Sequence, residues 1–422
     1  MVKLTQLPRD ALALIFEAIY EAHEDNHIAL SHTCRTFRAI SFGLPFLWSS
    51  LDSNMLSSKV EAYLSRSGDT GLTIILHSLF RLSRDDRWAR FIAQVLPHSP
   101  RWRKFVFSPG SGEGREFYTQ LSRKLAGLEL PMLESLSVLL RFGPSSDFVS
   151  ENGGSKDVRC FYKDWKLTRL SNAVVLIPSS LPLFDFLNLG ESRLTSLAIK
   201  ICNSHGYHEN LTISGVLEFL RLVPLLRDLQ LSFPFLTPES TSGISELPVP
   251  LYELREFSIR LLGYCTESTY LAMQELVHTM QMPALVKYHC SIYMPSHILA
   301  LRSAYSVKKL VVDVALWKCL EAALEAFPNI EELEVHKMLL NELTVIATPL
   351  AMYQLRQIYF AHCYFNNILY VEQLVDQIRG TSPQAGSLEK VILCGCCWRE
   401  SIGSDWNVPG VALEWKNMAH TD

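Results

Sequence analysis

From about residue 100 onward, one short pattern of apolar and polar positions returns along the chain. It consists of an apolar residue, two polar residues, an apolar residue, one variable residue and a final apolar residue. The two positions before the central apolar residue are polar in nineteen of twenty cases, and Val286 is the exception. The pattern predicts ten short strands. We call their central apolar residues the anchors: Phe105, Leu136, Leu197, Leu229, Phe257, Tyr288, Leu310, Leu333, Ile358 and Val391.

Proline marks the approach to these strands. It lies five residues before the anchor in five windows, whereas about half an occurrence is expected from 20 prolines among 422 residues. Most anchors are about 22 to 33 residues apart. The one longer interval, 61 residues between Leu136 and Leu197, predicts a degenerate unit near the stretch LSNAVVLI. The five prolines are Pro100, Pro131, Pro224, Pro283 and Pro328.

Amphipathic helical stretches lie between the predicted strands, for example YLAMQELVHTM, LWKCLEAALEAF and ILYVEQLVDQIR. A repeated strand–helix unit of this length cannot bury its apolar faces alone, so neighbouring units must stack around a continuous core. The predicted fold class is therefore an α/β solenoid, in which a small N-terminal helical domain precedes a curved, irregular strand–helix array.

The strand residues that point away from the core would line the concave surface of such a solenoid. Their charges are of both signs without a dominant stripe, which favours recognition of a protein or peptide surface over a phosphate backbone. The alternative is a solvated sheet face without a ligand. The candidate substrate-binding residues are Lys104, Asp228, Gln230, Glu256, Lys309, Glu332, Glu334, Gln357, Tyr359 and Lys390.

The first fifty residues follow a different pattern. In LPRDALALIF, Pro8 suits the first turn of a helix, and apolar residues then recur at three- and four-residue steps from Leu12 to Ile19. A second helical stretch ends at Gly43, and the apolar segment PFLW follows. Three short elements in about 45 residues bury too little surface to be stable alone. We therefore expect the remaining apolar surface to be a docking face.

This segment, from about Leu4 to Leu51, resembles an F-box in the order and spacing of its Leu-Pro opening, its Ile-Phe pair, its Cys-Arg-x-aromatic-Arg-x-Ile run and its final Pro-x-Leu-Trp. In that family the helices dock on a Skp-type adaptor, which joins them to a cullin-RING ubiquitin ligase. The resemblance implies the following adaptor-binding residues: Leu7, Pro8, Leu12, Ile15, Phe16, Leu30, Cys34, Phe37, Pro45, Leu47 and Trp48.

Two expectations follow for the adaptor contact. The family usually has Trp where this chain has Phe37, which predicts a reduced affinity for the adaptor. Phe16, Phe37 and Trp48 are expected to dominate the contact, because large apolar anchors carry most interface energy and burying each is worth about 1.5–3 kcal/mol. The alternative is that these helices only cap the C-terminal body.

The repeats resemble divergent leucine-rich repeats over roughly residues 70 to 397. In that family Asn or Cys often stands in the turn after each strand, and the resemblance would place Cys202, Cys363 and Cys396 there. The expected domains are an F-box-like adaptor-binding domain at 1–52, a leucine-rich-repeat-like solenoid at 53–400 and a C-terminal tail or cap at 401–422.

The composition narrows the classes of function. A net charge of −4 argues against a general nucleic-acid or anionic-membrane binder. No apolar run reaches the roughly 18 residues of a membrane span, and MVKLTQLPRD contains no secretory h-region. Ten cysteines without regular pairing intervals indicate reduced thiols in a cytoplasmic or nuclear protein.

Three short motifs suggest chemistry, but each has a better explanation. HEDNH (His23 to His27) matches a zinc-hydrolase spacing, yet its polar surroundings indicate a break between helices. CGCC (Cys394 to Cys397) lacks the second cysteine pair of a zinc site, and repeat-turn positions explain Cys396. GSGEG (Gly110 to Gly114) has no following Gly-Lys-Ser/Thr, so it indicates a glycine-rich loop. We therefore predict no catalytic residue, metal or cofactor.

Together these patterns predict the substrate-recognition subunit of an SCF-type E3 ubiquitin ligase. The N-terminal segment would bind the Skp-type adaptor, and the solenoid would bind an unknown protein target. The alternative is a scaffold or interaction protein without ligase function, whose N-terminal helices cap the solenoid. An enzyme comes third, because it would require an unmarked site in the concave face.

Overall fold

The computed structural model shows a mixed α/β fold that divides into two compact units. The first comprises residues 1–194 and 202–207, and the second comprises residues 195–201 and 208–422. The structure describes residues 7–22, 26–77, 87–108, 115–140, 162, 164–178, 193–202, 213–233, 247–262, 266–291, 299, 301, 304–313, 317–340, 354–365, 368–379, 388–398 and 408–416.

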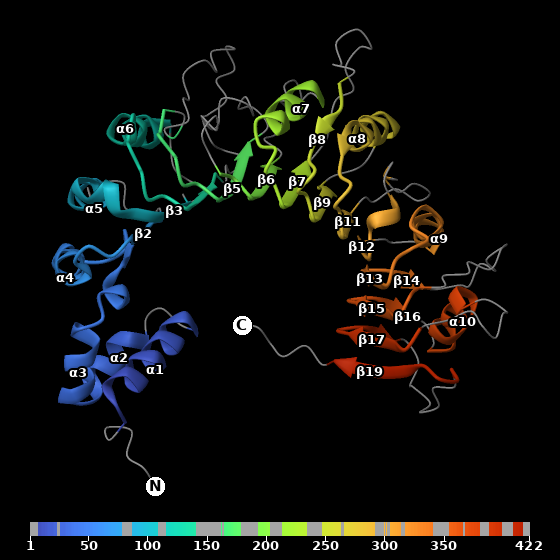
Figure 1. The fold of residues 1–422 in the computed structure, drawn as a ribbon, viewed down its shortest axis with the longest axis horizontal. Helices are drawn as coiled ribbons and strands as arrows, with labels where there is room; N and C mark the ends of the chain where they lie inside the picture. Colours follow the sequence, from blue (N-terminus) through green and yellow to red (C-terminus); the bar gives the residue numbers. More distant parts are fainter. Residues whose placement is uncertain are drawn as a thin grey trace. The chain divides into compact units, whose positions relative to one another are not determined.

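The first unit begins with helices and continues as a parallel sheet (Figure 1). Its helical elements are α1 (Arg9–Ala22), α2 (Asn26–Thr33), α3 (Arg35–Phe42), the 3-10 helix η2 (Pro45–Trp48), α4 (Ser57–Ser67), α5 (Arg87–Val95), η3 (Leu96–Arg101) and α6 (Arg115–Leu125). Each of its described strands except the last pairs in parallel with the next one along the chain. These are β1 (Ser50–Asp52), β2 (Leu72–His77), β3 (Trp102–Ser108), β4 (Ser135–Leu139) and β5 (Asn172–Pro178).

The second unit repeats this arrangement, with its helices on one side of the strands (Figure 1). Its main strands, again parallel and in chain order, are β6 (Ser196–Cys202), β7 (Asp228–Phe233), β9 (Glu256–Leu261), β11 (Lys287–Ser291), β12 (Lys309–Asp313), β13 (Glu332–His336), β15 (Gln357–Ala361), β17 (Lys390–Cys394) and β19 (Ala412–Lys416). Its helices are α7 (Ile213–Arg221), α8 (Glu267–Thr279), α9 (Trp317–Ala326), α10 (Ile368–Arg379) and the 3-10 helix η6 (Ala304–Ser306).

Short strands form two further parallel ladders in the second unit. Strand β8 (Val249–Pro250) pairs with β10 (Met280–Gln281). Strand β16 (Tyr364–Phe365) lies between β14 (Leu339–Leu340) and β18 (Cys397–Trp398).

All ten predicted anchors are buried, with at most 1% of each residue exposed. Phe105 lies opposite Leu136 in the first unit. In the second unit the eight anchors from Leu197 to Val391 occupy one continuous row across neighbouring strands. The ten predicted strands are therefore confirmed, and β5 confirms the degenerate unit predicted within the longest interval. The common register of the anchors is a finding of the structure.

A repeated backbone interaction sets this register. The carbonyl two residues before an anchor accepts hydrogen bonds from two consecutive N–H groups of the next strand. Arg255 O accepts from Val286 N at 2.8 Å and Lys287 N at 2.9 Å, and Val286 O accepts from Lys308 N at 2.8 Å and Lys309 N at 3.0 Å. The same pair of bonds is made by the carbonyls of Glu134, Thr195, Arg227, Lys308, Glu331 and Arg356.

Several of the recurring prolines lie in the turn that leads into the strand. Pro131 follows Leu130, whose carbonyl accepts a bond from Leu133 N at 3.1 Å. Equivalent turns are closed around Pro224 by Leu226 N to Val223 O at 3.3 Å and around Pro283 by Leu285 N to Met282 O at 3.2 Å. Proline is favoured at the second position of such turns because its ring fixes φ near the required value.

The strands of the last repeats end in a common left-handed turn. Lys337, His362 and Gly395 follow β13, β15 and β17 with φ of 58°, 53° and 58°. The next residues include Cys363 and Cys396, which lie in this turn as predicted. The prediction for Cys202 is wrong, because β6 has seven residues, two more than β15 and β17, and Cys202 is its last residue.

The left-handed turn gives a prediction about stability. Gly395→Ala should lower the free energy of unfolding by about 1–2 kcal/mol, because a Cβ is disfavoured at this φ. His362→Gly, at the equivalent turn, should not lower the free energy of unfolding, because glycine adopts this positive φ without steric strain. Urea unfolding followed by circular dichroism would compare them, and equal losses in both variants would contradict the argument.

Candidate functional site

The N-terminal helices are held by local backbone interactions. Leu12 N donates to Pro8 O at 3.1 Å, so Pro8 stands at the start of α1. Cys34 caps α3, where its Sγ accepts a hydrogen bond from Phe37 N at 3.4 Å. Gly43 ends α3 by donating its N–H to the carbonyls of the last turn. The helix start at Pro8 and the helix end at Gly43 lie where the sequence indicates them, whereas the single second helical stretch that was predicted is divided at Cys34 into α2 and α3.

Trp48 joins this helical segment to the first strand–helix repeat. Its indole Nε1 donates to Ser41 O at 2.8 Å. Its ring packs edge-on against Tyr63 of α4 at 5.1 Å between centroids, and the Arg66 guanidinium lies 4.5 Å from the ring centroid. Phe16 of α1 likewise packs edge-on against Phe37 at 5.5 Å. Both side chains therefore belong to the core of the first unit.

The predicted adaptor-binding residues differ in their exposure. Those that are buried are Leu12, Phe16, Leu47 and Trp48. Those that are half-buried are Leu7, Ile15, Leu30, Cys34 and Phe37, and those that are exposed are Pro8 and Pro45. The expectation that Phe16 and Trp48 dominate a partner contact is corrected here, because the chain itself covers 99% and 97% of these residues.

The apolar surface that remains on α1 includes a residue that the sequence analysis missed. Leu14 is 66% exposed, and it precedes the half-buried Ile15. With Pro8 and Leu7 it forms what we call the α1 surface. The sequence pattern did not select Leu14, because it lies one position away from the apolar stripe that the three- and four-residue steps define.

The burial of Phe16 and Trp48 predicts a structural role for both. Phe16→Ala and Trp48→Ala should each lower the free energy of unfolding by about 3–5 kcal/mol, because each substitution leaves a cavity in the core. Leu14→Ala is the matched control and should change it by less than about 0.5 kcal/mol. Chemical denaturation of the isolated protein measures these differences, and small losses for Phe16→Ala and Trp48→Ala would place the two side chains outside the core.

The predicted substrate-binding residues all lie on strands, and none is buried. Lys104 lies in the first unit and the other nine lie in the second. The strand register brings most of them into two rows. Those directly before an anchor are Asp228, Glu256, Lys309, Glu332, Gln357 and Lys390, and those directly after one are Gln230, Glu334 and Tyr359.

Ion pairs connect neighbours along these rows. Lys287 Nζ lies 2.9 Å from Glu256 Oε2. Lys309 Nζ lies 3.3 Å from Glu332 Oε2 and 3.2 Å from Glu334 Oε2. Burial lowers the pKa of Lys309, but these carboxylates outweigh burial and raise it overall. Several pairs of opposite charge thus lie on adjacent strands, and these ion pairs account for much of the mixed charge of the sequence pattern.

A second cluster on the same strands was not predicted. Asp313 Oδ1 lies 3.4 Å from His289 Nε2 and 3.4 Å from His336 Nδ1, and its side chain is only 7% exposed. His336 Nε2 lies 2.7 Å from Glu334 Oε1, and Arg260 Nη2 lies 3.2 Å from His289 Nδ1. The register creates this cluster, because Asp313 lies opposite His336 on one side and Ser291 on the other.

The cluster shifts the titration of its two carboxyl groups. Burial would raise the pKa of Asp313, but the hydrogen bond from His289, with Ser291 and His336, lowers it to about 2. The hydrogen bond from His336 and the charge of Lys309 lower the pKa of Glu334 to about 2, against an opposing effect of burial. Both carboxylates are therefore held ionised, and their contacts with the two histidines and Lys309 stabilise the paired strands.

Asp313 yields a prediction about pH. Because its folded pKa of about 2 lies below the ordinary 3.8, its stabilisation is full above pH 3.8 and is lost as the pH falls toward 2. Asp313→Asn should therefore cost about 2 kcal/mol at neutral pH, and the difference from wild type should shrink on acidification. Urea unfolding at several pH values measures it, and a difference that does not change with pH would contradict it.

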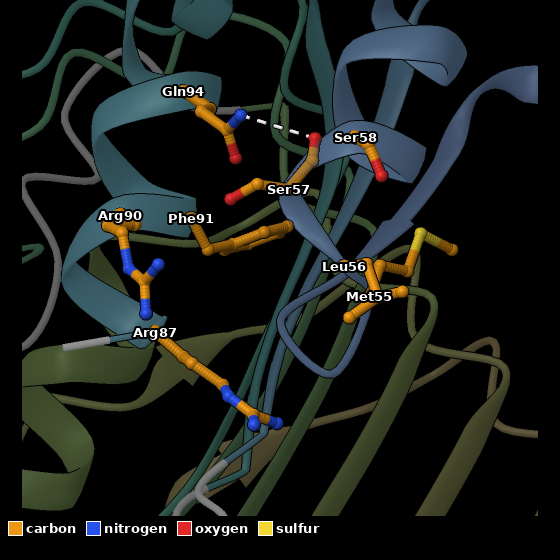
Figure 2. Close-up of a pocket in the computed structure, with 8 residues that line it drawn as sticks. All are labelled: Met55, Leu56, Ser57, Ser58, Arg87, Arg90, Phe91 and Gln94. Atoms are coloured by element: carbon orange, nitrogen blue, oxygen red, sulfur yellow. Dashed lines mark hydrogen bonds between the residues drawn. The ribbon is translucent and has the colours of Figure 1, made fainter. Parts of the chain in front are cut away.

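Two hollows are lined by charged side chains. One, of about 380 Å³ in the first unit, lies between the start of α4 and α5, as Figure 2 shows. The Gln94 amide crosses it to Ser57 O at 3.3 Å, and Arg87 and Arg90 are exposed at its edge. The other, of about 400 Å³ in the second unit, is formed by the first residues of β9, β11, β12 and β13 with the residues just before them. We call the second hollow the strand-start groove.

The cysteines of the last repeats pack in the turns. Cys363 is 1% exposed, and its thiol donates to Val335 O at 3.4 Å. The hydrogen bond between Cys363 and Cys396 lowers the pKa of Cys396 to about 7 and, together with burial, raises that of Cys363.

Within the described residues, no group of three or more His, Cys, Asp or Glu side chains is arranged to hold a metal ion. His23 to Asp25 and Gly110 to Gly114 lie outside the described residues.

No protein-family model matches the chain, and no curated protein has significant similarity to it. None of the described helices combines the length and apolar character needed to cross a membrane. The site is therefore defined by geometry alone: a partly apolar α1 surface in one unit and a charged strand-start groove in the other.

Proposed function

We propose that the protein is the substrate-recognition subunit of an SCF-type ubiquitin ligase. In this proposal the N-terminal helices bind a Skp-type adaptor, and the strand face of a leucine-rich-repeat-like solenoid binds the target protein. The observation that carries the proposal is the order of elements: an F-box-like segment with an exposed Leu14, followed by sequential parallel strands in one register. The protein would perform no bond chemistry itself and would act by holding two partners close together.

The exposure of the N-terminal residues supports a docking role for the α1 surface. Leu14, at 66% exposure, presents an aliphatic side chain without a cover from the described part of the chain. Pro8 is exposed just before the first residue of the same helix, and Leu7 is half-buried. Burial of such apolar side chains by a partner contributes favourable free energy to binding, because it removes apolar surface from water. In this proposal the adaptor contact lies on the α1 surface, and Phe16, packed against Phe37, holds α1 in place.

A second function has one specific observation in its favour. The packing of Trp48 on Tyr63 and Arg66 fastens the N-terminal helices to α4, as a cap at the end of a repeat array would be fastened. In that case the protein would be a scaffold, and the strand face would bind its partner without recruiting a ligase.

Co-purification with a Skp-type adaptor distinguishes the two functions. Wild-type protein should capture the adaptor stoichiometrically, and Leu14→Arg should reduce the capture at least tenfold, because a charge would be buried in an apolar contact. Leu271→Arg is the control, since Leu271 of α8 is 56% exposed and lies in the second unit. Circular dichroism would establish that all three proteins are folded.

Each outcome of this experiment is informative. Capture that is lost only in Leu14→Arg supports the ligase subunit and the α1 surface. Failure of folded wild-type protein to capture the adaptor would leave the capped scaffold as the better proposal. Equal capture by wild type and Leu14→Arg would mean that the adaptor is a partner but that its contact does not include the α1 surface.

A further inference from the structure

We infer that the strand-start groove binds a segment of protein chain that presents a carboxylate side chain next to an aliphatic one. The inference rests on the proposed function, since it names the kind of target segment that the strand face would hold. The residues that line the groove are Arg255, Glu256, Val286, Lys287, Lys308, Lys309, Glu331 and Glu332.

The charges in the groove leave one cation uncompensated. Its four basic side chains face three acidic ones. Each acid has a lysine partner: Glu256 pairs with Lys287 at 2.9 Å, Glu331 with Lys308 at 2.9 Å and Glu332 with Lys309 at 3.3 Å. Arg255, which is exposed, makes no ion pair with any described residue. Its guanidinium is therefore available to a carboxylate, which it can bind through two parallel hydrogen bonds.

The groove also contains the only apolar residue among the twenty that precede the anchors. Val286 is 46% exposed, and its position is polar in each of the other nine windows. Its backbone is fixed on both sides, by bonds to Arg255 O and from Lys308 N and Lys309 N. The side chain is therefore held in place although it contributes nothing to the core, and it offers an apolar contact beside the unpaired arginine.

These two features together define the chemistry of the bound segment. A lone carboxylate would use Arg255 only, and a purely apolar segment would have to cover the ion pairs beside Val286 without matching them. A segment with neighbouring acidic and aliphatic side chains would contact both residues. The paired lysines disfavour a nucleic-acid backbone, because each already neutralises a carboxylate and would have to release it.

A randomised peptide library displayed on phage tests the inference with the full chain. Peptides selected on wild-type protein should be enriched in Asp or Glu adjacent to Leu, Ile or Val. Synthetic copies of selected peptides, measured by fluorescence anisotropy, should bind Arg255→Gln roughly tenfold or more weakly than wild type, and Val286→Thr several-fold more weakly. Val286→Thr removes the apolar contact without adding a charge, and Thr195 occupies the equivalent position in another repeat, so the fold should be kept.

Arg227→Gln provides the matched control. Arg227 occupies the same position before Leu229 that Arg255 occupies before Phe257, and it lies outside the groove. Its substitution should leave the affinity unchanged. Selection of no peptide, absence of the acidic–aliphatic pair, or equal losses in Arg227→Gln and Arg255→Gln would each overturn the inference. Adaptor capture by Arg255→Gln should equal that of wild type, so a failure of the groove is distinguishable from a failure of the ligase proposal.

Discussion

The structure depends on one backbone interaction, the sharing of a single carbonyl by two N–H groups of the next strand. It recurs at the start of successive strands, for example from Arg227 through Arg255 and Val286 to Lys308. Because it fixes which residue lies opposite which, it places every anchor above another anchor. The apolar core, the outward charge rows and the strand-start groove all follow from that one alignment.

Much of this fold could be predicted from the sequence because the repeat is local. The anchors, the strand β5 hidden in the longest interval and several proline turns each depend on residues within one unit. The cluster of His289, Asp313 and His336 could not be predicted in the same way. Its members come from three different strands, and only the register across repeats reveals that they meet.

The N-terminal segment shows a different limit of prediction from sequence. A motif identifies which residues are apolar, but it does not say whether the chain or a partner covers them. Trp48 is covered by Tyr63 and Arg66, which lie in the next helix and outside the motif. Leu14, in contrast, stands outside the predicted stripe and remains exposed. Burial is a property of the whole unit, so only the structure shows which apolar residues of this segment stay exposed.

The buried anchors and the exposed residues before them have different roles, and this difference affects which substitutions the protein can accept during evolution. The side chain of Val286 points to solvent while its backbone carries the register, so this position can exchange an apolar for a charged group without disturbing the core. Each repeat contacts mainly its two neighbours. New binding preferences can therefore arise one repeat at a time, through single substitutions that leave the inherited architecture intact.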